Sequence, residues 1–211
     1  MPPAPASPFA DAAATWNARF QDKDYIFGTE PNAYLRQHAG VLPAGGRVLC
    51  VADGEGRNSV WLAQQGFVVE AFDISDVGVA KARKLADSAG VTVHYAVSDC
   101  DGWSWPEDTY DGVAAIFIQF ADPAMRERLF ARMVRALKPG GILILQGYTP
   151  KQLEYKTGGP PLVSHLYTEA MLREAFAGME ILELREYEDA LTEGKQHFGR
   201  SALVGIVARK R

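Results

Sequence analysis

Residues 47–75 read RVLCVADGEGRNSVWLAQQGFVVEAFDIS, and this stretch predicts the fold. The apolar run 48–52 is long enough for one buried strand. The turn 53–56 contains two glycines, which permit tight backbone geometry and close approach of a ligand. Residues 57–65 follow a helical pattern that ends at Gly66, and a second apolar run ends at Asp73. A strand, a glycine turn, a helix and a strand ending in an acid form the first half of a nucleotide-binding α/β sheet.

Acidic side chains around this turn indicate which nucleotide it suits. Asp53 and Glu55 lie within the turn, and Asp73 follows the second strand. A pyrophosphate would have to approach this turn, and like charges repel more strongly as the effective dielectric falls. Arg57 offsets only one of the acids. The sequence therefore favours a cofactor that carries positive charge and no phosphate. S-adenosylmethionine (SAM) has a sulfonium, an α-ammonium and a ribose diol that suits a carboxylate.

The rest of the chain continues the alternation of strands and helices. We expect strands at 91–97, 110–117 and 142–148, and helices at 75–88, 123–137 and 168–176. Two final strands, 180–187 and 201–209, are expected to be joined by a long loop, 188–200. The pattern predicts an α/β fold with a seven-stranded, mostly parallel, doubly wound sheet whose last strand is antiparallel. Ligands bind such sheets at the carboxyl ends of the strands. That edge would collect the acids Asp53, Glu55, Asp73, Asp99 and Asp101.

Composition narrows the class of protein further. The net charge of −4, without a basic cluster, argues against a nucleic-acid partner. No apolar run approaches the roughly 20 residues of a membrane span. The four histidines show no metal-ligand spacing, so we expect no metal site. We expect a cytoplasmic protein, a monomer or weak homodimer, acting on a small molecule and not at a membrane.

Several segments together resemble a known family. They are VLCVADGEGRNSVWLA (48–63), VEAFDIS (69–75), SDCD (98–101), LKPGGILILQGYTPKQL (137–153), TGGPP (157–161) and, before them, WNARF…YIFGTEPNAYL (16–35). On these residues the chain resembles the class I SAM-dependent methyltransferases, and most closely the small bacterial tellurite-resistance and thiopurine-type enzymes. It departs from the common class I loop at Cys50, where that loop has an acid, and at Ala52, where it has its first glycine.

The resemblance implies a division of the chain and a set of cofactor contacts. Residues 1–8 would be a mobile leader, and 9–211 a single methyltransferase domain with an N-terminal lid (9–40) and an α/β core (41–211). Asp73 would accept both ribose hydroxyls, Asp99 the adenine amino group, and the backbone N–H of Cys100 would serve an adenine nitrogen. Arg19 would pair with the cofactor carboxylate. The full set of expected cofactor-binding residues is Arg19, Phe27, Ala52, Asp53, Gly54, Gly56, Asn58, Asp73, Ile74, Asp99, Cys100, Asp101 and Phe117.

The acceptor side is less specific in the sequence. We expect His197, as a base or an acceptor contact, with Tyr148 and Gln119 to shape the acceptor pocket. The resemblance suggests a thiol, a chalcogenite or a similar nucleophile as acceptor, with S-adenosylhomocysteine as the product of the cofactor. Two alternatives stay open at this point. One is an NAD-dependent oxidoreductase on a similar sheet, and the other is a SAM-binding protein without turnover.

Overall fold

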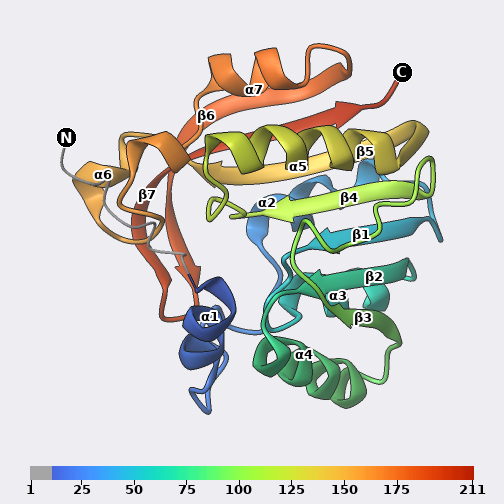
Figure 1. The fold of residues 1–211 in the computed structure, drawn as a ribbon, viewed down its shortest axis with the longest axis vertical. Helices are drawn as coiled ribbons and strands as arrows, with labels where there is room; N and C mark the ends of the chain where they lie inside the picture. The colour runs from blue at the N-terminus through green and yellow to red at the C-terminus, as the bar shows by residue number, and fades with distance from the viewer. Residues whose placement is uncertain (1–10) are drawn as a thin grey trace.

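The structure is a computed structural model that describes residues 11–211, and these residues form one seven-stranded sheet (Figure 1). The strand order is β3-β2-β1-β4-β5-β7-β6. Neighbours from β3 to β5 are parallel, and β7 is antiparallel to both β5 and β6. The predicted fold class is therefore confirmed. The strands are β1 (Arg47–Val51), β2 (Val68–Asp73), β3 (Val93–Val97), β4 (Tyr110–Ile116), β5 (Leu137–Tyr148), β6 (Glu180–Glu193) and β7 (His197–Arg209).

Helices cover both faces of this sheet. In β1, Val48 and Cys50 pack into one core with α2, α3 and α4, while Leu49 and Val51 pack into the other with α5 and α7. A strand buried on both faces explains the unbroken apolar run in the sequence. The helices are α1 (Ala12–Phe20), α2 (Ala33–His38), α3 (Arg57–Gln64), α4 (Asp76–Ala89), α5 (Pro123–Ala136), α6 (Gln152–Tyr155) and α7 (Glu169–Ala175), with short 3-10 helices at Ala39–Val41 and Val163–His165.

The helix starts follow from local capping. Ser75, Asp122 and Thr168 each accept a backbone N–H from the first turn of the helix that follows, as the sequence predicts. Asp11 does the same for α1, which begins at Ala12. The predicted leader, 1–8, lies outside the described residues. Among the helices of residues 11–211, none combines the length and apolar content that crossing a membrane requires.

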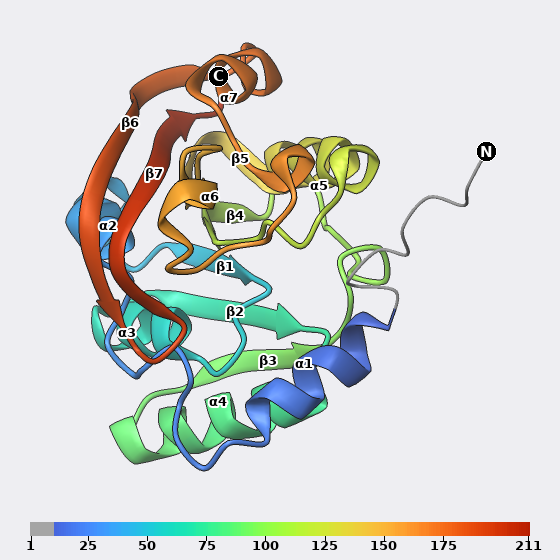
Figure 2. The same cartoon turned by 90° about the vertical axis from the view of Figure 1, so that its left-hand side faces the viewer.

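The predicted loop at 188–200 is wrong. Strands β6 and β7 continue through it as a hairpin whose pairing extends to Glu193 and His197, and Gly194 turns the chain with a φ of +67°. Figure 2 shows this hairpin curving along one side of the molecule, with its tip beside the N-terminal segment. The segment EDALTEGKQHFGR lacks the alternating apolar pattern of a strand, so the sequence contains no local signal for this extension.

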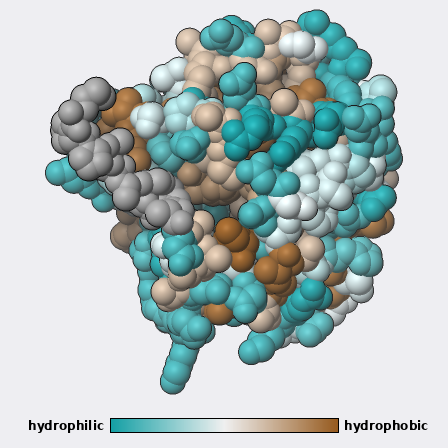
Figure 3. Space-filling view, viewed as in Figure 1, coloured by the Kyte–Doolittle hydropathy of each residue, from teal (hydrophilic) through white to brown (hydrophobic). Residues whose placement is uncertain are grey.

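Strand order reverses between β1 and β4. From β1 the chain continues to β2 and β3 on one side of the sheet, and from β4 it continues to β5 on the other side. The neighbours of β1 are β2 and β4, so the connections from β1 and β4 leave the sheet in opposite directions. Such a switch point leaves a crevice at the carboxyl ends of the two strands. The face seen in Figure 3 is hollowed near its middle, where these strand ends lie in Figure 1, and apolar side chains gather at the rim.

Candidate active site

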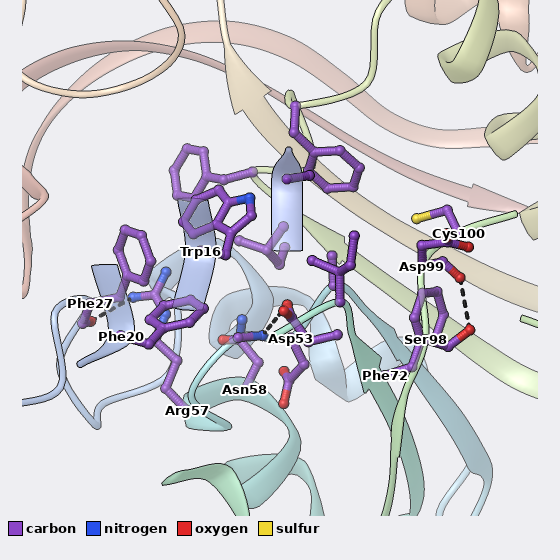
Figure 4. Close-up of a pocket in the computed structure, with 18 of the residues that line it drawn as sticks. Trp16, Phe20, Phe27, Asp53, Arg57, Asn58, Phe72, Ser98, Asp99 and Cys100 are labelled. Atoms are coloured by element: carbon purple, nitrogen blue, oxygen red, sulfur yellow. Dashed lines mark hydrogen bonds between the residues drawn. The ribbon is translucent and has the colours of Figure 1, made fainter. Parts of the chain in front are cut away.

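A cavity of about 200 Å³ lies at the carboxyl ends of β1, β2, β3 and β4. Segment 12–27 covers it from the other side. In Figure 4, Trp16, Phe20 and Phe27 face Ser98, Asp99 and Cys100 across the pocket. The residues that line this cofactor cavity are Ala12, Trp16, Phe20, Phe27, Ala52, Asp53, Gly54, Arg57, Asn58, Phe72, Asp73, Ile74, Ser98, Asp99, Cys100, Ile116, Phe117, Phe120, Met125 and His197.

The turn after β1 has an unusual backbone. Ala52, which stands in place of the usual glycine, has a φ of +49°, a left-handed conformation that is costly for any residue with a Cβ atom. Gly54 has a φ of +63°, and a Cβ atom there would lie 3.3 Å from the ring of Phe20. The turn therefore presents bare backbone to the cavity, with the N-terminal helix packed closely upon it.

Asp53 is the most perturbed acid in the cavity. Its Oδ2 accepts a hydrogen bond from the hydroxyl of Ser59, while its buried Oδ1 has no hydrogen-bond partner within residues 11–211. Burial raises the pKa of Asp53 to about 7, and the negative charge of Asp73 adds to the rise. A buried carboxylate oxygen without a partner is costly, and a cationic ligand beside it would relieve that cost.

Asp73 closes β2 and ties two loops together. Its Oδ2 accepts the backbone N–H of Gly54 and its Oδ1 that of Ser75, both at 2.8 Å. Burial raises the pKa of Asp73 to about 6 even though these N–H groups act in the opposite direction. Each oxygen retains a further lone pair, so the side chain is held rigidly and can still accept hydrogen bonds from a ligand.

Asp99, Cys100 and Ile74 also line the cavity. Asp99 is exposed, and its Oδ1 accepts the backbone N–H of Gly102 at 2.5 Å. Burial raises the pKa of the Cys100 thiol to about 12, so the side chain is neutral at physiological pH. Trp103 does not reach the cavity; it stacks on Phe72 with ring centroids 4.8 Å apart.

Only three of the five acids expected at this edge line the cavity. Glu55 turns away, forms an ion pair with Lys81 and accepts the backbone N–H of Ile26 at 2.8 Å. Asp101 points to the surface, 2.5 Å from Arg132.

Gly56 is also outside the cavity, because α4 packs against it and a Cβ atom would lie 2.7 Å from that of Ala82. The expected cofactor contacts of Asp101 and Gly56 are thus not supported by their positions.

A second cavity of about 320 Å³ adjoins the first. The two share an aromatic wall formed by Trp16, Phe27, Phe117, Phe120 and His197. Its other lining residues are Thr15, Arg19, Gln119, Tyr148, Gly158, Gly159, Pro160, Pro161 and Gln196. The long connection between β5 and α7 supplies the glycines and prolines of this lining.

The charges of the two cavities differ sharply. The described lining of the second cavity contains no aspartate or glutamate, and its cation is Arg19. The guanidinium of Arg19 lies 4.4 Å from the ring of Trp16 and donates to the Gln196 side chain at 3.0 Å. The structure therefore places Arg19 beside the second cavity and not in the cofactor cavity, where the sequence reading assigned it to the cofactor carboxylate.

The three acceptor-side residues expected from the sequence all line this second cavity. Tyr148 has a buried hydroxyl without a hydrogen-bond partner in the described part of the chain. Gln119 has both amide ends engaged, donating to Tyr148 O and accepting from Tyr148 N, so it shapes the wall. His197 lies between the rings of Phe27 and Phe117, at 4.7 and 4.3 Å, and burial lowers its pKa.

Several lining residues were not expected as ligand contacts from the sequence, among them Trp16, Phe20 and Arg57. Trp16 and Phe20 stack with ring centroids 5.5 Å apart, and their four-residue spacing was a visible signal of a shared helix face. Arg57, assigned there only to offsetting an acid, instead pairs with Glu193 at 2.8 Å. No local sequence pattern predicts this ion pair, because Glu193 lies 136 residues further along the chain than Arg57.

The side chains of the first cavity fit SAM. An unpartnered carboxylate oxygen on Asp53 suits the α-ammonium or sulfonium, and the rigid Asp73 suits a ribose diol. The three acids would repel a pyrophosphate instead. No group of three or more metal-ligating side chains occurs within residues 11–211.

Comparisons with known proteins point the same way. Residues 48–141 match a family described as a methyltransferase domain. The chain is 29% identical over 199 residues to a thiopurine S-methyltransferase of Pseudomonas fluorescens, covering 84% of this chain and 86% of that protein. It is 27% identical over 159 residues to thiocyanate methyltransferase 1 of Arabidopsis thaliana, covering 74% and 68%. The fold matches a SAM-dependent methyltransferase of Methanosarcina mazei with a TM-score of 0.69 and 20% identity, covering 86% and 98%.

Proposed function

Since the chain belongs to the class I SAM-dependent methyltransferases, we propose that it transfers the methyl group of SAM to a small, soft nucleophile held in the second cavity. The acceptor class is a thiol or a chalcogenite anion. The earlier alternatives, an NAD-dependent oxidoreductase and a binding protein without turnover, find no support in these comparisons.

The observation that carries this proposal is the separation of charge between two adjoining cavities. Asp53, Asp73 and Asp99 line the first, which suits a cationic cofactor. The described lining of the second is free of acids and contains Arg19 and the unpartnered Tyr148 hydroxyl. A neutral or anionic nucleophile is therefore favoured there, whereas an amine cation would find no carboxylate.

The residues of the site supply binding and orientation. Asp73 is proposed to hold the ribose, Asp53 the cationic end, and Asp99 with the Cys100 N–H the adenine. Bound SAM supplies an activated methyl group on a sulfonium, whose departure needs no protonation. The chain therefore has to align the acceptor and exclude water, and such positioning can account for much of a rate enhancement.

The aromatic wall performs that exclusion at the junction of the cavities. Phe117 has a φ of +56°, and its ring stacks on Tyr148 at 4.7 Å and meets His197 at 4.3 Å. Strained backbone of this kind is concentrated at functional sites. His197 is uncharged near neutral pH because burial lowers its pKa, so it is able to take a proton from an acceptor that arrives as the thiol.

The names of two relatives agree with a soft acceptor. One is a thiopurine S-methyltransferase and the other a thiocyanate methyltransferase. These names belong to those proteins, and the charges that line the second cavity support a neutral or anionic acceptor for this chain. The aromatic wall, together with Pro160 and Pro161, gives that cavity a largely apolar lining.

Transfer from methyl-labelled SAM to thiophenol, selenite and phenol tests the proposal. We expect methylation of thiophenol or selenite and little of phenol. SAM binding without transfer to any thiol or chalcogenite would exclude the acceptor class. Arg19→Gln is expected to raise KM for an anionic acceptor several-fold and to leave the affinity for S-adenosylhomocysteine unchanged. Arg36→Gln, at an exposed site on α2, is the matched control.

A further inference from the structure

The tip of the β6–β7 hairpin, residues 193–197, is joined to the N-terminal segment by direct contacts. Lys195 N donates to Ile26 O at 2.8 Å, and Lys195 Nζ lies 2.7 Å from Asp24. Gly194 packs so closely that an added Cβ atom would lie 2.4 Å from Ile26 O. Figure 2 shows the hairpin reaching this segment from the far edge of the sheet. Two parts of the chain that frame the cavities are therefore held to each other.

Glu193 is the buried centre of this junction. Its side chain is 9% exposed, and its Oε2 lies 2.8 Å from Arg57 Nη2, which is equally enclosed. Its Oε1 accepts from Asn32 Nδ2 at 2.9 Å and from Ala33 N at 3.2 Å. One carboxylate thus connects the hairpin, the helix after the glycine turn, and the start of α2. None of these contacts requires Glu193 to face either cavity, and it lines neither.

The partners of Glu193 bear directly on the aromatic wall. Arg57 Nη1 also donates to Phe27 O at 3.4 Å (Figure 4). His197 is the pairing partner of Glu193 across the hairpin, with Nδ1 3.8 Å from Oε2. Phe27 and His197 are in ring contact at 4.7 Å, and both line both cavities. The position of this wall therefore depends on Glu193 through two separate paths.

The charge of Glu193 is maintained by its surroundings. Burial by itself would raise the pKa of Glu193, but His197, Arg57 and the backbone N–H of Ala33 together lower it to about 2. The carboxylate is ionised throughout the physiological range. Removing the charge would leave Arg57 buried without its counter-ion, which a folded protein tolerates poorly unless the structure opens to water.

We propose that Glu193 is a positioning residue that latches the N-terminal segment over the cofactor cavity and sets the aromatic wall shared with the second cavity. It touches neither cofactor nor acceptor. Its effect passes through Arg57 and Asn32 to the segment that contains Phe27, and through the hairpin to His197. The proposal concerns closure over the cofactor and does not depend on the identity of the acceptor.

Glu193→Gln is the first test. The amide oxygen can still accept from Asn32, but the charge facing Arg57 is lost. We expect dissociation of S-adenosylhomocysteine, measured by stopped flow, to quicken by about tenfold or more, the scale of one charge-assisted hydrogen bond. Trypsin cleavage after the exposed Lys23 should also accelerate in the presence of S-adenosylhomocysteine. A purely structural role would lower the melting temperature and leave the release rate of the folded protein unchanged.

Gly194→Ala tests the same latch without removing any buried charge. The new methyl group would push the hairpin tip away from Ile26. Gly45→Ala is its matched control, because Gly45 has a similar φ of +71° and open space around its Cβ position. We expect Gly194→Ala to speed release and cleavage as Glu193→Gln does, with Gly45→Ala like the wild type.

These measurements distinguish a latch from a purely structural role of Glu193. If Glu193→Gln folds and releases S-adenosylhomocysteine at the wild-type rate, the latch is excluded. If Glu193→Gln does not fold, Gly194→Ala decides, and equal release rates for Gly194→Ala and Gly45→Ala exclude it. Failure of wild-type protein to methylate any thiol would instead count against the proposed acceptor alone.

Discussion

The carboxylate of Asp73 accepts the backbone N–H of Gly54 at 2.8 Å, which ties the end of β2 to the glycine turn that follows β1. Its other oxygen accepts the N–H of Ser75 at the start of α4. One side chain thus organises two adjacent strand ends, and it lines the cofactor cavity. The first prediction follows from this double engagement.

Asp73→Asn should weaken binding of S-adenosylhomocysteine by about 10- to 100-fold, corresponding to the roughly 1.5–3 kcal/mol of a hydrogen bond to a charged group. In the asparagine, an NH₂ group replaces one of the two oxygens that accept backbone N–H groups. Two donors would then face each other, so the turn is disturbed as well. Isothermal titration calorimetry measures the change. Asp76→Asn, three residues further on and exposed, should bind as the wild type does. Equal affinities for the two variants would remove Asp73 from the cofactor site.

Binding of SAM should be linked to proton release. Burial raises the pKa of Asp53 to about 7 and that of Asp73 to about 6, so the free protein holds part of these protons near neutral pH. A cationic ligand favours the ionised forms, and its affinity should therefore increase as the pH rises toward about 7.5 and then level off. Calorimetry in buffers of different ionisation enthalpy counts the protons released. Asp53→Asn should remove the part of this dependence that lies nearest pH 7.

The raised pKa of Asp53 also affects the stability of the protein without ligand. Its free energy of unfolding should fall as the pH rises, whereas the affinity for SAM should increase. Asp53 has an ordinary pKa of 3.8 when unfolded and about 7 when folded. Between these values the folded state binds more protons, so its free energy of unfolding should fall as the pH rises through this window. Urea titrations across it should show a smaller decline for Asp53→Asn than for the wild type. A wild-type stability that rises over the same range in parallel with Asp53→Asn would contradict the assigned burial.

Two tyrosines offer a paired test of the second cavity. Tyr148→Phe removes a hydroxyl that has no partner within residues 11–211, so stability should stay within about 0.5 kcal/mol of the wild type while KM for the acceptor rises several-fold. Tyr110→Phe removes a hydroxyl that donates to Glu70 at 2.8 Å, far from either cavity. It should cost about 1.5–3 kcal/mol, because the acceptor is a carboxylate, and leave KM unchanged. An unchanged KM in Tyr148→Phe would place the acceptor elsewhere.

Ala52→Gly should stabilise the fold. The left-handed backbone at Ala52 costs roughly 1–2 kcal/mol, part of which is offset by the greater freedom of glycine in the unfolded chain, so we expect a gain of about 0.5–1 kcal/mol. Ala63→Gly, inside α3, should destabilise by about 1 kcal/mol. Chemical denaturation measures both. A loss of stability in Ala52→Gly would mean that the Cβ atom of Ala52 contributes packing that outweighs the strain.

The helices and the parallel strands were predictable because their signals are local. Ser75, Asp122 and Thr168 cap helices at the expected positions. The extension of the β6–β7 hairpin was not predictable, since residues 188–200 are mostly polar and the hairpin tip contacts a segment that is distant in the sequence. The orientation of the Glu55 side chain could not be predicted either, because its partner Lys81 comes from α4.

By itself, the amino-acid sequence determined the α/β sheet and the place of the acidic glycine turn at its carboxyl edge. Periodicity, glycines and helix caps act over a few residues, and the carboxyl ends of parallel strands all lie at the same edge of the sheet. Only the tertiary structure decided that Asp53, Asp73 and Asp99 face the cavity while Glu55 and Asp101 pair with basic side chains on helices. It also decided that Glu193 meets Arg57 and that Arg19 lies beside the second cavity. The direction of each of these side chains depends on partners from distant parts of the chain, which meet only when the sheet, the hairpin and the N-terminal segment pack together.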